Sequence, residues 1–251
     1  MVEKRMKRNV WKYFTESFKT LWKQPIIVIP LLINVIVSFI SLMIADFASS
    51  GNPLIQEYAA TGAIASFSLE SFYPLIAIYA VALIISFLIS SFFYAGAIGM
   101  IYDVVRKKKT SLKAMVDYGK KFFLRLIGIN IVLGLLSMAG ITIALLPLLI
   151  DQTWLTFILT LILGIAFVLF MILFLLSNIY LIIQNKGVLA SISKSFSVIK
   201  KNYFRFILLI ILLTACGALV NFIPYIGMLI SQLIIGSASG IAFVLFALDN
   251  K

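Results

Sequence analysis

Side chains that could perform acid–base or metal chemistry are scarce in this sequence and lie far apart. The chain contains no histidine, the residue that most often serves as a general base or metal ligand. Its nine acidic residues are Glu3, Glu16, Asp46, Glu57, Glu70, Asp103, Asp117, Asp151 and Asp249. No two of them are three or four residues apart, so no helix turn carries a carboxylate pair for a divalent cation. We therefore predict that this chain is not an enzyme and uses no metal or cofactor.

Serine and cysteine nucleophiles are not indicated either. The alternate serines from Ser191 to Ser197 have no base nearby in the sequence, and we interpret them as the solvated face of a helix. The single cysteine, Cys216, lies in an apolar run, where it excludes an intrachain disulfide and offers no metal-ligand spacing. We interpret Cys216 as a small packing residue.

Ionisable groups inside apolar segments would indicate ion-coupled transport, because such groups are costly in a bilayer. Asp46 and Asp103 come nearest to this condition, and both lie near the ends of apolar segments. Asp46 has no basic residue close by in the sequence, so it is either a carboxylate at the outer interface or part of a site. Asp103 precedes Arg106 and Lys107, which favours a local ion pair or a helix-end position.

Three asparagines lie well inside the apolar segments and have two interpretations. Asn34, Asn130 and Asn178 could form hydrogen bonds between helices, which is the usual role of such residues in a bilayer. They could instead line a polar cavity together with Asp46. The sequence leaves both alternatives open.

The elements that carry these residues are predicted to be membrane-spanning helices. The 251 residues are 63% apolar and 12% charged, which is too little polar surface for a soluble domain. Six segments have the roughly 20 apolar residues that an α-helix needs to cross a bilayer. They are residues 26–47, 75–102, 122–146, 154–183, 204–223 and 226–248. We predict an all-α protein with six transmembrane helices in a single integral membrane domain, residues 1–251.

The positions of the basic residues predict how these helices are oriented. All 21 Lys and Arg residues lie within residues 4–23, 106–125 and 186–205 or at Lys251. Basic residues are retained on the cytoplasmic side, so both termini are predicted to be cytoplasmic and the protein to lie in the cell membrane. The net charge of +12 sits beside membrane-length apolar runs, which favours anionic lipid headgroups over nucleic acid as partners. The candidate headgroup contacts are Arg106, Lys107, Lys108, Lys109, Lys120, Lys121, Lys200, Lys201 and Arg205.

Each basic stretch also carries apolar residues at helical spacing. The apolar face holds Met6, Val10, Tyr13, Phe14, Ser17, Phe18 and Leu21 in the first stretch, Leu112, Met115 and Val116 in the second, and Val188, Leu189, Ile192, Phe196 and Ile199 in the third. We predict a cytoplasmic amphipathic helix at the membrane surface before each pair of spans, with this face toward the bilayer.

The basic stretches also resemble one another in sequence. Sliding the second onto the third by 80 residues places Ser111 on Ser191, Lys120 and Lys121 on Lys200 and Lys201, and Arg125 on Arg205. The first stretch aligns less closely, with Ser17, Phe18 and Lys23 on Ser195, Phe196 and Lys201. We interpret the chain as three copies of one unit, approximately residues 1–105, 106–184 and 185–251, each an interfacial helix followed by a hairpin of two spans.

Residues 185–207, NKGVLASISKSFSVIKKNYFRFI, resemble the signature of a broad group of six-span membrane proteins. The matching positions are Gly187, Ala190, Ser195, Phe196, Asn202, Tyr203 and Phe204; Tyr102, the basic run after it and Ser111 to Leu112 resemble the corresponding segment of the earlier copy. The group includes the membrane domain joined to some glycerophosphodiester phosphodiesterases and related uncharacterised inner-membrane proteins. The resemblance implies the fold and a cytoplasmic-membrane location. It implies no activity, because this chain lacks the separate phosphodiesterase domain.

Two functions are compatible with these features. The first is a non-enzymatic membrane protein that organises lipid or a membrane protein complex, with anionic headgroups and either a second copy or another membrane protein as partners. The alternative is a channel or permease for a small or lipid-like solute, enclosed by the hairpins. The long outer connection, residues 48–74, could then be a lid over the path, or simply a short helix on the membrane surface.

Overall fold

A computed structural model of the chain is all-helical and describes residues 9–51, 73–150, 153–224 and 226–250. Helix accounts for 91% of the structure, and the described residues contain no strand. Six helical segments are long and apolar enough to cross a membrane, at 25–44, 73–107, 112–148, 154–184, 203–221 and 227–249. These segments confirm the predicted multi-pass membrane architecture.

The α-helices follow one another with short connections. In chain order they are α1 (Val10–Lys23), α2 (Val28–Ser50), α4 (Tyr73–Lys107), α5 (Leu112–Ile150), α6 (Trp154–Met171), α7 (Ser177–Gln184), α8 (Val188–Lys201), α9 (Tyr203–Asn221), α10 (Gly227–Ile230) and α11 (Gly236–Asp249). Two 3-10 segments, η1 (Pro25–Ile27) and η3 (Ile172–Phe174), and one π-helical segment, η4 (Ser231–Ile235), lie between them.

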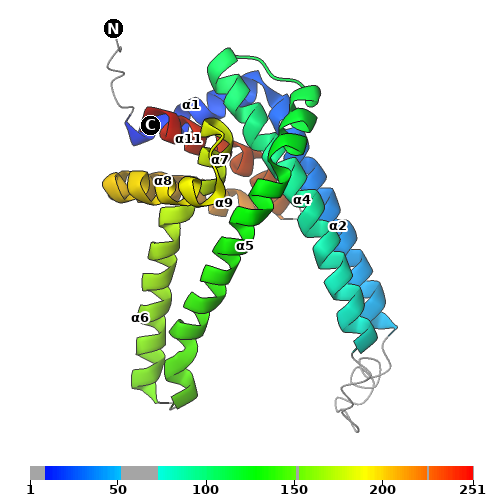
Figure 1. The fold of residues 1–251 in the computed structure, drawn as a ribbon, viewed down its shortest axis with the longest axis vertical. Coiled ribbons are helices and arrows are strands. Elements are labelled where there is room, and N and C mark those ends of the chain that lie inside the picture. The colour runs from blue at the N-terminus through cyan, green and yellow to red at the C-terminus, as the bar shows by residue number, and fades with distance from the viewer. Residues whose placement is uncertain (1–8, 52–72, 151–152, 225, 251) are drawn as a thin grey trace.

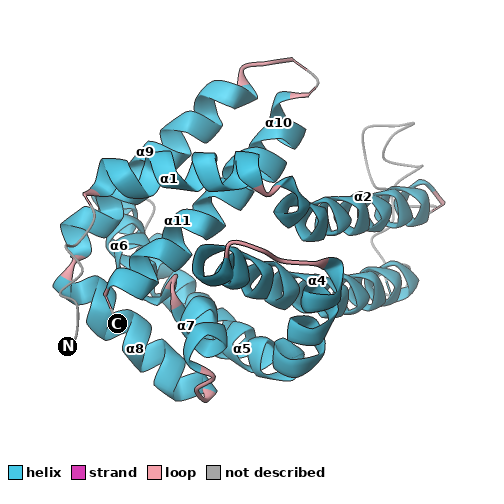
Figure 2. Ribbon diagram, turned by 90° about the horizontal axis from the view of Figure 1, so that it is seen from above, coloured by secondary structure: helices cyan, strands magenta, loops and turns pink. Residues whose placement is uncertain are grey.

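Three helical hairpins diverge from one packed region of the molecule. Helix α2 packs along α4, α5 packs along α6, and α9 packs against α10 and η4. Their far ends point in different directions (Figures 1 and 2). We call the packed region the hub: it consists of α1, α4 from Ser91 onward, α5 up to Ile129, α7, α8 and α11, which contact one another.

The buried core lies in the hub because several helices are longer than a bilayer is thick. Helix α4 has 35 residues, about 52 Å at 1.5 Å per residue, against a hydrocarbon core of about 30 Å. Its buried residues all lie between Ser91 and Val104, in the part nearest the basic loop. Helix α6, by contrast, has no buried residue. The outer parts of the hairpins are therefore covered by few protein contacts, as expected of lipid-facing helices.

The hairpin of α2 and α4 is joined by hydroxyl groups in its lipid-facing part. Ser41 and Ser86 are hydrogen-bonded to each other, and the hydroxyl groups of Ser49 and Tyr79 lie 2.7 Å apart. Between helices in a bilayer, such pairs satisfy polar groups that have no water to bond.

Glycines allow the start of α5 to cross α4 closely. A Cβ atom at Gly96 would meet Met115 at 2.6 Å, and one at Gly99 would overlap the ring of Tyr118. The approach is mutual, since a Cβ at Gly119 would meet the Phe92 ring at 2.8 Å. The close approach of the two backbones thus determines how α4 and α5 pack against each other in the hub.

The apolar faces of the basic stretches differ from the prediction in what they contact. Val10, Tyr13 and Leu21 are buried, because α1 packs against α11 and α9. Met115 is only 7% exposed and packs on α4 at Gly96. These four residues were predicted to face the bilayer, but protein covers them, because the projecting ends of the spans offer an apolar surface first. Leu112 and Leu189, on the same predicted faces, are exposed.

Three predicted helix boundaries also differ. The second basic stretch is not a separate helix, since α5 runs without a break from Leu112 to Ile150. The third span, predicted to end at residue 146, continues through Pro147 to Ile150, because the one hydrogen bond that proline removes does not end the helix so close to its last residue. The fourth span is interrupted at η3. The connection at 48–74 falls mostly outside the described residues, so the choice between surface helix and lid stays open.

Candidate functional site

The candidate site is the basic end of the molecule, defined as the Lys and Arg side chains of α1, of the end of α4, the link after it and the start of α5, and of α8 with the start of α9. Eight of the nine predicted headgroup contacts are exposed: Arg106, Lys107, Lys108, Lys109, Lys120, Lys121, Lys200 and Lys201. Arg205 is half-buried. The structure therefore brings three distant stretches together around the hub (Figure 1) and leaves most of their basic side chains exposed.

Asp103 is the one acidic residue buried in this region. Its carboxylate accepts a hydrogen bond from the Tyr118 hydroxyl at 3.2 Å and pairs with the Lys107 ammonium at 3.0 Å. The local ion pair predicted for Asp103 is confirmed. The neighbouring Arg106 guanidinium instead donates to the Tyr102 hydroxyl at 2.6 Å and lies over the Tyr102 ring. Asp103 is thus a packing residue of the hub with a satisfied charge.

Lys108 joins the first basic stretch to the second. The Gln24 amide, one residue after α1, donates to the Lys108 carbonyl at 3.3 Å. Lys108 itself has a φ of 61°, the left-handed conformation that often follows the last residue of a helix. This backbone turn directs the chain from α4 into the basic link.

A similar contact joins the second stretch to the third. The Arg125 guanidinium on α5 donates to the Asn185 side-chain oxygen at 3.0 Å. Asn185 caps the end of α7 and, like Lys108, is left-handed, with a φ of 50°. Asparagine adopts this conformation more readily than lysine does.

The last helix closes the set of contacts by meeting the first. The Tyr13 hydroxyl on α1 donates to the Asp249 carboxylate at 3.1 Å, and its ring packs on Phe246 with the centroids 5.5 Å apart. The Tyr180 hydroxyl on α7 reaches the Ala247 carbonyl on the same helix at 3.4 Å. Each basic stretch is therefore bonded to another part of the chain at the hub.

A small cleft opens between α1 and the link after α4. Its volume is about 290 Å³, and its polar lining comes from Glu16, Thr20, Lys23, Gln24 and Lys108. Two ammonium groups beside a hydroxyl could hold the phosphate of a lipid headgroup. Lys23 was not among the predicted headgroup contacts. It lies in the first basic stretch, residues 4–23, for which the sequence predicted an amphipathic helix.

Two tryptophans mark the same end of the molecule. Trp11 is 60% exposed and Trp22 is 88% exposed, both on α1. Exposed tryptophan beside lysine is typical of a helix at the membrane–water interface, where the ring lies among headgroups. Trp154 is the first residue of α6 and is 84% exposed. Helix α6 begins at the end of its hairpin that lies away from the hub (Figure 1).

The alternate serines do not form a solvated face, so that prediction is wrong for two of them. Ser191 and Ser195 are fully buried, whereas Ser193 and Ser197 are exposed. The Ser195 hydroxyl donates to the Leu173 carbonyl at 2.8 Å and accepts from the Leu176 amide at 3.1 Å. These two backbone groups lie at the interruption of the fourth span, where the regular helical pattern of hydrogen bonds is lost. Ser195 is therefore a structural residue that supplies the missing partners.

The structure brings together two of the four residues predicted for a polar cavity. The Asn178 amide donates to the Asn130 side-chain oxygen at 3.4 Å. Asn178 also lines a pocket of about 420 Å³, together with Tyr94, Ser137 and Leu175. The Asn178 side-chain oxygen is buried without a hydrogen-bond partner among the described residues. Polar atoms left in this state at a pocket indicate a place for water or a polar ligand group.

The other two predicted cavity residues lie elsewhere. Asn34 is on α2, and its side-chain oxygen is also buried without a partner in the described part of the chain. Asp46 is exposed near the outer end of α2. Within the described ranges, no group of three His, Cys, Asp or Glu side chains could hold a metal ion. The absence of enzymatic activity remains a prediction.

No protein-family model matches this chain, and neither a curated protein nor a solved structure is significantly similar to it. The resemblance to the six-span membrane group therefore stays a prediction.

Proposed function

We propose that this multi-pass membrane protein binds anionic lipids around its basic end and thereby organises lipid, without catalysing a reaction. The observation that carries the proposal is the exposure of basic side chains from three distant stretches around one hub. A basic residue at an anionic membrane surface contributes about 1 kcal/mol, so a group of this size favours anionic lipid strongly.

Few of these basic side chains form ion pairs within the described part of the protein. Within the described residues, the ion pairs join Lys12 to Glu16 at 3.9 Å and Lys107 to Asp103 at 3.0 Å. Lys109, Lys120 and Lys201 are exposed and have no carboxylate partner in the described ranges. Their charges are available to headgroups. The cytoplasmic cell membrane, where anionic lipids face the basic end, is part of the same proposal.

The proposal includes the threefold repeat inferred from the sequence. Three contacts support a closed arrangement of the three units: Gln24 with Lys108, Arg125 with Asn185, and Tyr13 with Asp249. The first joins the first basic stretch to the second, the second joins the second basic stretch to the start of the third unit, and the third joins the first unit to the end of the last span. Such an arrangement would present the basic residues as a ring rather than as separate patches.

The chain's own tryptophans allow a direct test of lipid selectivity. Trp11→Phe with Trp154→Phe leaves Trp22 as the reporter, and Trp11→Phe with Trp22→Phe leaves Trp154. Each protein is reconstituted in vesicles that contain either brominated phosphatidylglycerol or brominated phosphatidylcholine at the same mole fraction. We expect brominated phosphatidylglycerol to quench Trp22 more strongly, and both lipids to quench Trp154 equally.

Charge variants then show whether lysines cause the preference. The triple change Lys23→Gln, Lys108→Gln and Lys109→Gln should bring the quenching of Trp22 by the two lipids close together. Raising the salt concentration should act in the same direction, because the ions screen exposed charges. Equal quenching of Trp22 by the two lipids in the unaltered basic end would refute the proposal.

A second candidate function, passage of a small or lipid-like solute, is supported by the pocket at Asn178. Replacing Asn178 by leucine would remove the amide from a lining that also contains Tyr94 and Ser137. We expect Asn178→Leu to lower solute flux into liposomes without changing the amount of folded protein, with Asn34→Leu as the control outside the pocket. Flux no greater than in protein-free liposomes, for uncharged solutes of several sizes, would exclude this function.

A further inference from the structure

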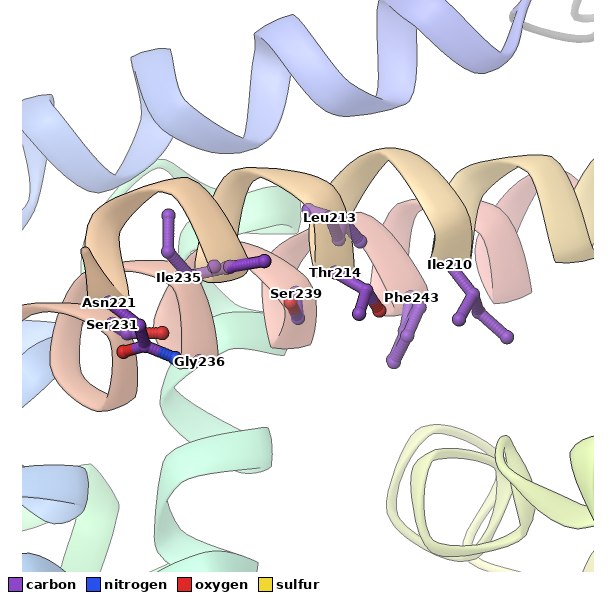
Figure 3. A pocket seen from close by; sticks show the side chains of 11 residues that line it. Ile210, Leu213, Thr214, Asn221, Ser231, Ile235, Gly236, Ser239 and Phe243 are labelled. Atoms are coloured by element: carbon purple, nitrogen blue, oxygen red, sulfur yellow. The ribbon is translucent and has the colours of Figure 1, made fainter. Parts of the chain in front are cut away.

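A second pocket lies in the last hairpin, and no basic residue lines it. Its volume is about 410 Å³, within the range of small-molecule sites. It lies between α9 and the span formed by α10, η4 and α11 (Figure 3). The lining residues are Ile210, Leu213, Thr214, Gly217, Ala218, Asn221, Ser231, Ile235, Gly236, Ser239 and Phe243. Ala218, Asn221 and Gly236 keep exposed surface, so the pocket is accessible from outside the hairpin.

The local backbone explains why space is left here. The span is π-helical over Ser231–Ile235, and such wide turns occur often at functional sites. On the facing helix, Gly217 lies so close that a Cβ atom would be 3.2 Å from the Ser231 hydroxyl. The helices therefore touch at Gly217 and separate beside it.

The pocket has a polar end and an apolar end. Figure 3 shows Asn221 and Ser231 together at one end and Ile210 and Phe243 at the other. Thr214 and Ser239 lie between them. The distance from Ile210 to Asn221 along α9 is about 16 Å at 1.5 Å per residue. This gradient matches a molecule with one polar head and one apolar chain.

The polar side chains in the pocket have unused hydrogen-bonding capacity. Thr214, Asn221, Ser231 and Ser239 make no side-chain hydrogen bond within the described residues. Unbonded polar groups are costly where lipid replaces water, so a ligand that bonds them is favoured. No charged residue lines the pocket, so nothing there would offset the cost of burying a charged head.

We infer that this pocket binds an uncharged, single-chain amphiphile whose head carries hydroxyl or carbonyl groups. The head lies at Asn221 and Ser231, and the chain extends past Thr214 toward Ile210 and Phe243. Helix α9 begins next to the basic stretch and ends at Asn221, so the head faces the membrane surface opposite the basic end. A lipid of that leaflet has the same orientation.

The structure provides a matched control for ordinary lipid contact. A groove of about 440 Å³ on α6 is lined by Thr160, Leu161, Gly164, Ile165, Val168 and Leu169. It is similar in size to the α9 pocket but has a single hydroxyl residue and no polar end. Lipid should occupy this groove without selectivity.

The test uses fluorescence quenching by a brominated monoacylglycerol in protein whose three tryptophans are replaced by phenylalanine. Ile210→Trp reports on the pocket, and Ile165→Trp reports on the α6 groove. We expect quenching at position 210 to saturate and to be reversed by unlabelled monoacylglycerol. Quenching at position 165 should rise in proportion to the probe. Phe243→Trp serves as a second pocket reporter if Ile210→Trp does not fold.

Substitution of the polar end should weaken this binding. We expect Ser231→Ala with Asn221→Leu to raise the apparent dissociation constant of the probe at least about tenfold. Thr160→Val should leave it unchanged. Quenching that is linear at both reporters, or unaffected by the paired substitution in folded protein, would overturn the inference. The probe has no charged headgroup, so the result of this test does not depend on whether the basic end binds anionic lipid.

Discussion

The hydroxyl of Tyr13 donates a hydrogen bond to the carboxylate of Asp249, 236 residues later in the chain, at 3.1 Å. Tyr13 is 1% exposed, because α1 packs against α11 and α9. The bond therefore connects the first described helix to the last, at the same end of the molecule as the basic residues.

Removing this bond should loosen the hub. We expect Tyr13→Phe to lower the free energy of unfolding by about 1 to 2 kcal/mol, because a partly buried hydrogen bond to a charged group is lost. The measurement is SDS-induced unfolding in mixed micelles. Tyr102→Phe, which removes an exposed contact to Arg106 within one helix, is the control and should cost less. Equal losses for the two variants would contradict a special role for Tyr13.

The buried hydroxyl of Ser195 should be far more important than its exposed neighbours. Ser195→Ala leaves the Leu176 amide and the Leu173 carbonyl without their partner, and we expect a loss of about 2 kcal/mol. Ser193→Ala, on the exposed face of the same helix, should change stability by less than about 0.5 kcal/mol. Thermal unfolding followed by tryptophan fluorescence would separate the two. A neutral Ser195→Ala would mean that another group bonds the interrupted span.

The glycines of the hairpins should differ sharply in their tolerance of a methyl group. In Gly99→Ala the new carbon would overlap the Tyr118 ring, and we expect a loss of about 2 kcal/mol or more. At Gly134, on α5, a Cβ atom would meet nothing within 4 Å. Gly134→Ala should therefore be neutral or slightly stabilising. The fraction of protein that stays monodisperse after heating in detergent gives the comparison directly.

Lys108 is held in a conformation that glycine adopts without strain. Lys108→Gly should raise the free energy of unfolding by about 1 kcal/mol, because a left-handed φ of 61° is costly for lysine. Lys108→Ala removes the same charge but keeps the strained backbone, so it is the matched control and should not stabilise. If both variants gained equally, charge repulsion rather than backbone strain would be the cause.

Much of this architecture followed from local sequence. Each of the six predicted spans lies within or overlaps an apolar helix of the structure, because the length and hydropathy of a span are properties of consecutive residues. The pairing of Asp103 with Lys107 followed from their spacing on one helix. For Asn130 and Asn178 the sequence offered interhelical hydrogen bonds and a polar cavity as alternatives and named no partner, since nothing local in the sequence shows which helices adjoin.

The sequence by itself determined that the chain is a helical membrane protein with its basic residues grouped between particular spans. Only the tertiary structure decided that α1 packs on α11, that Ser195 bonds the backbone of the interrupted fourth span, and that a pocket remains between α9 and the last span. The physical reason is that an apolar face in the sequence has no fixed partner. Lipid and another helix can both bury it, and which of them does so depends on the ends of spans that lie tens to hundreds of residues away.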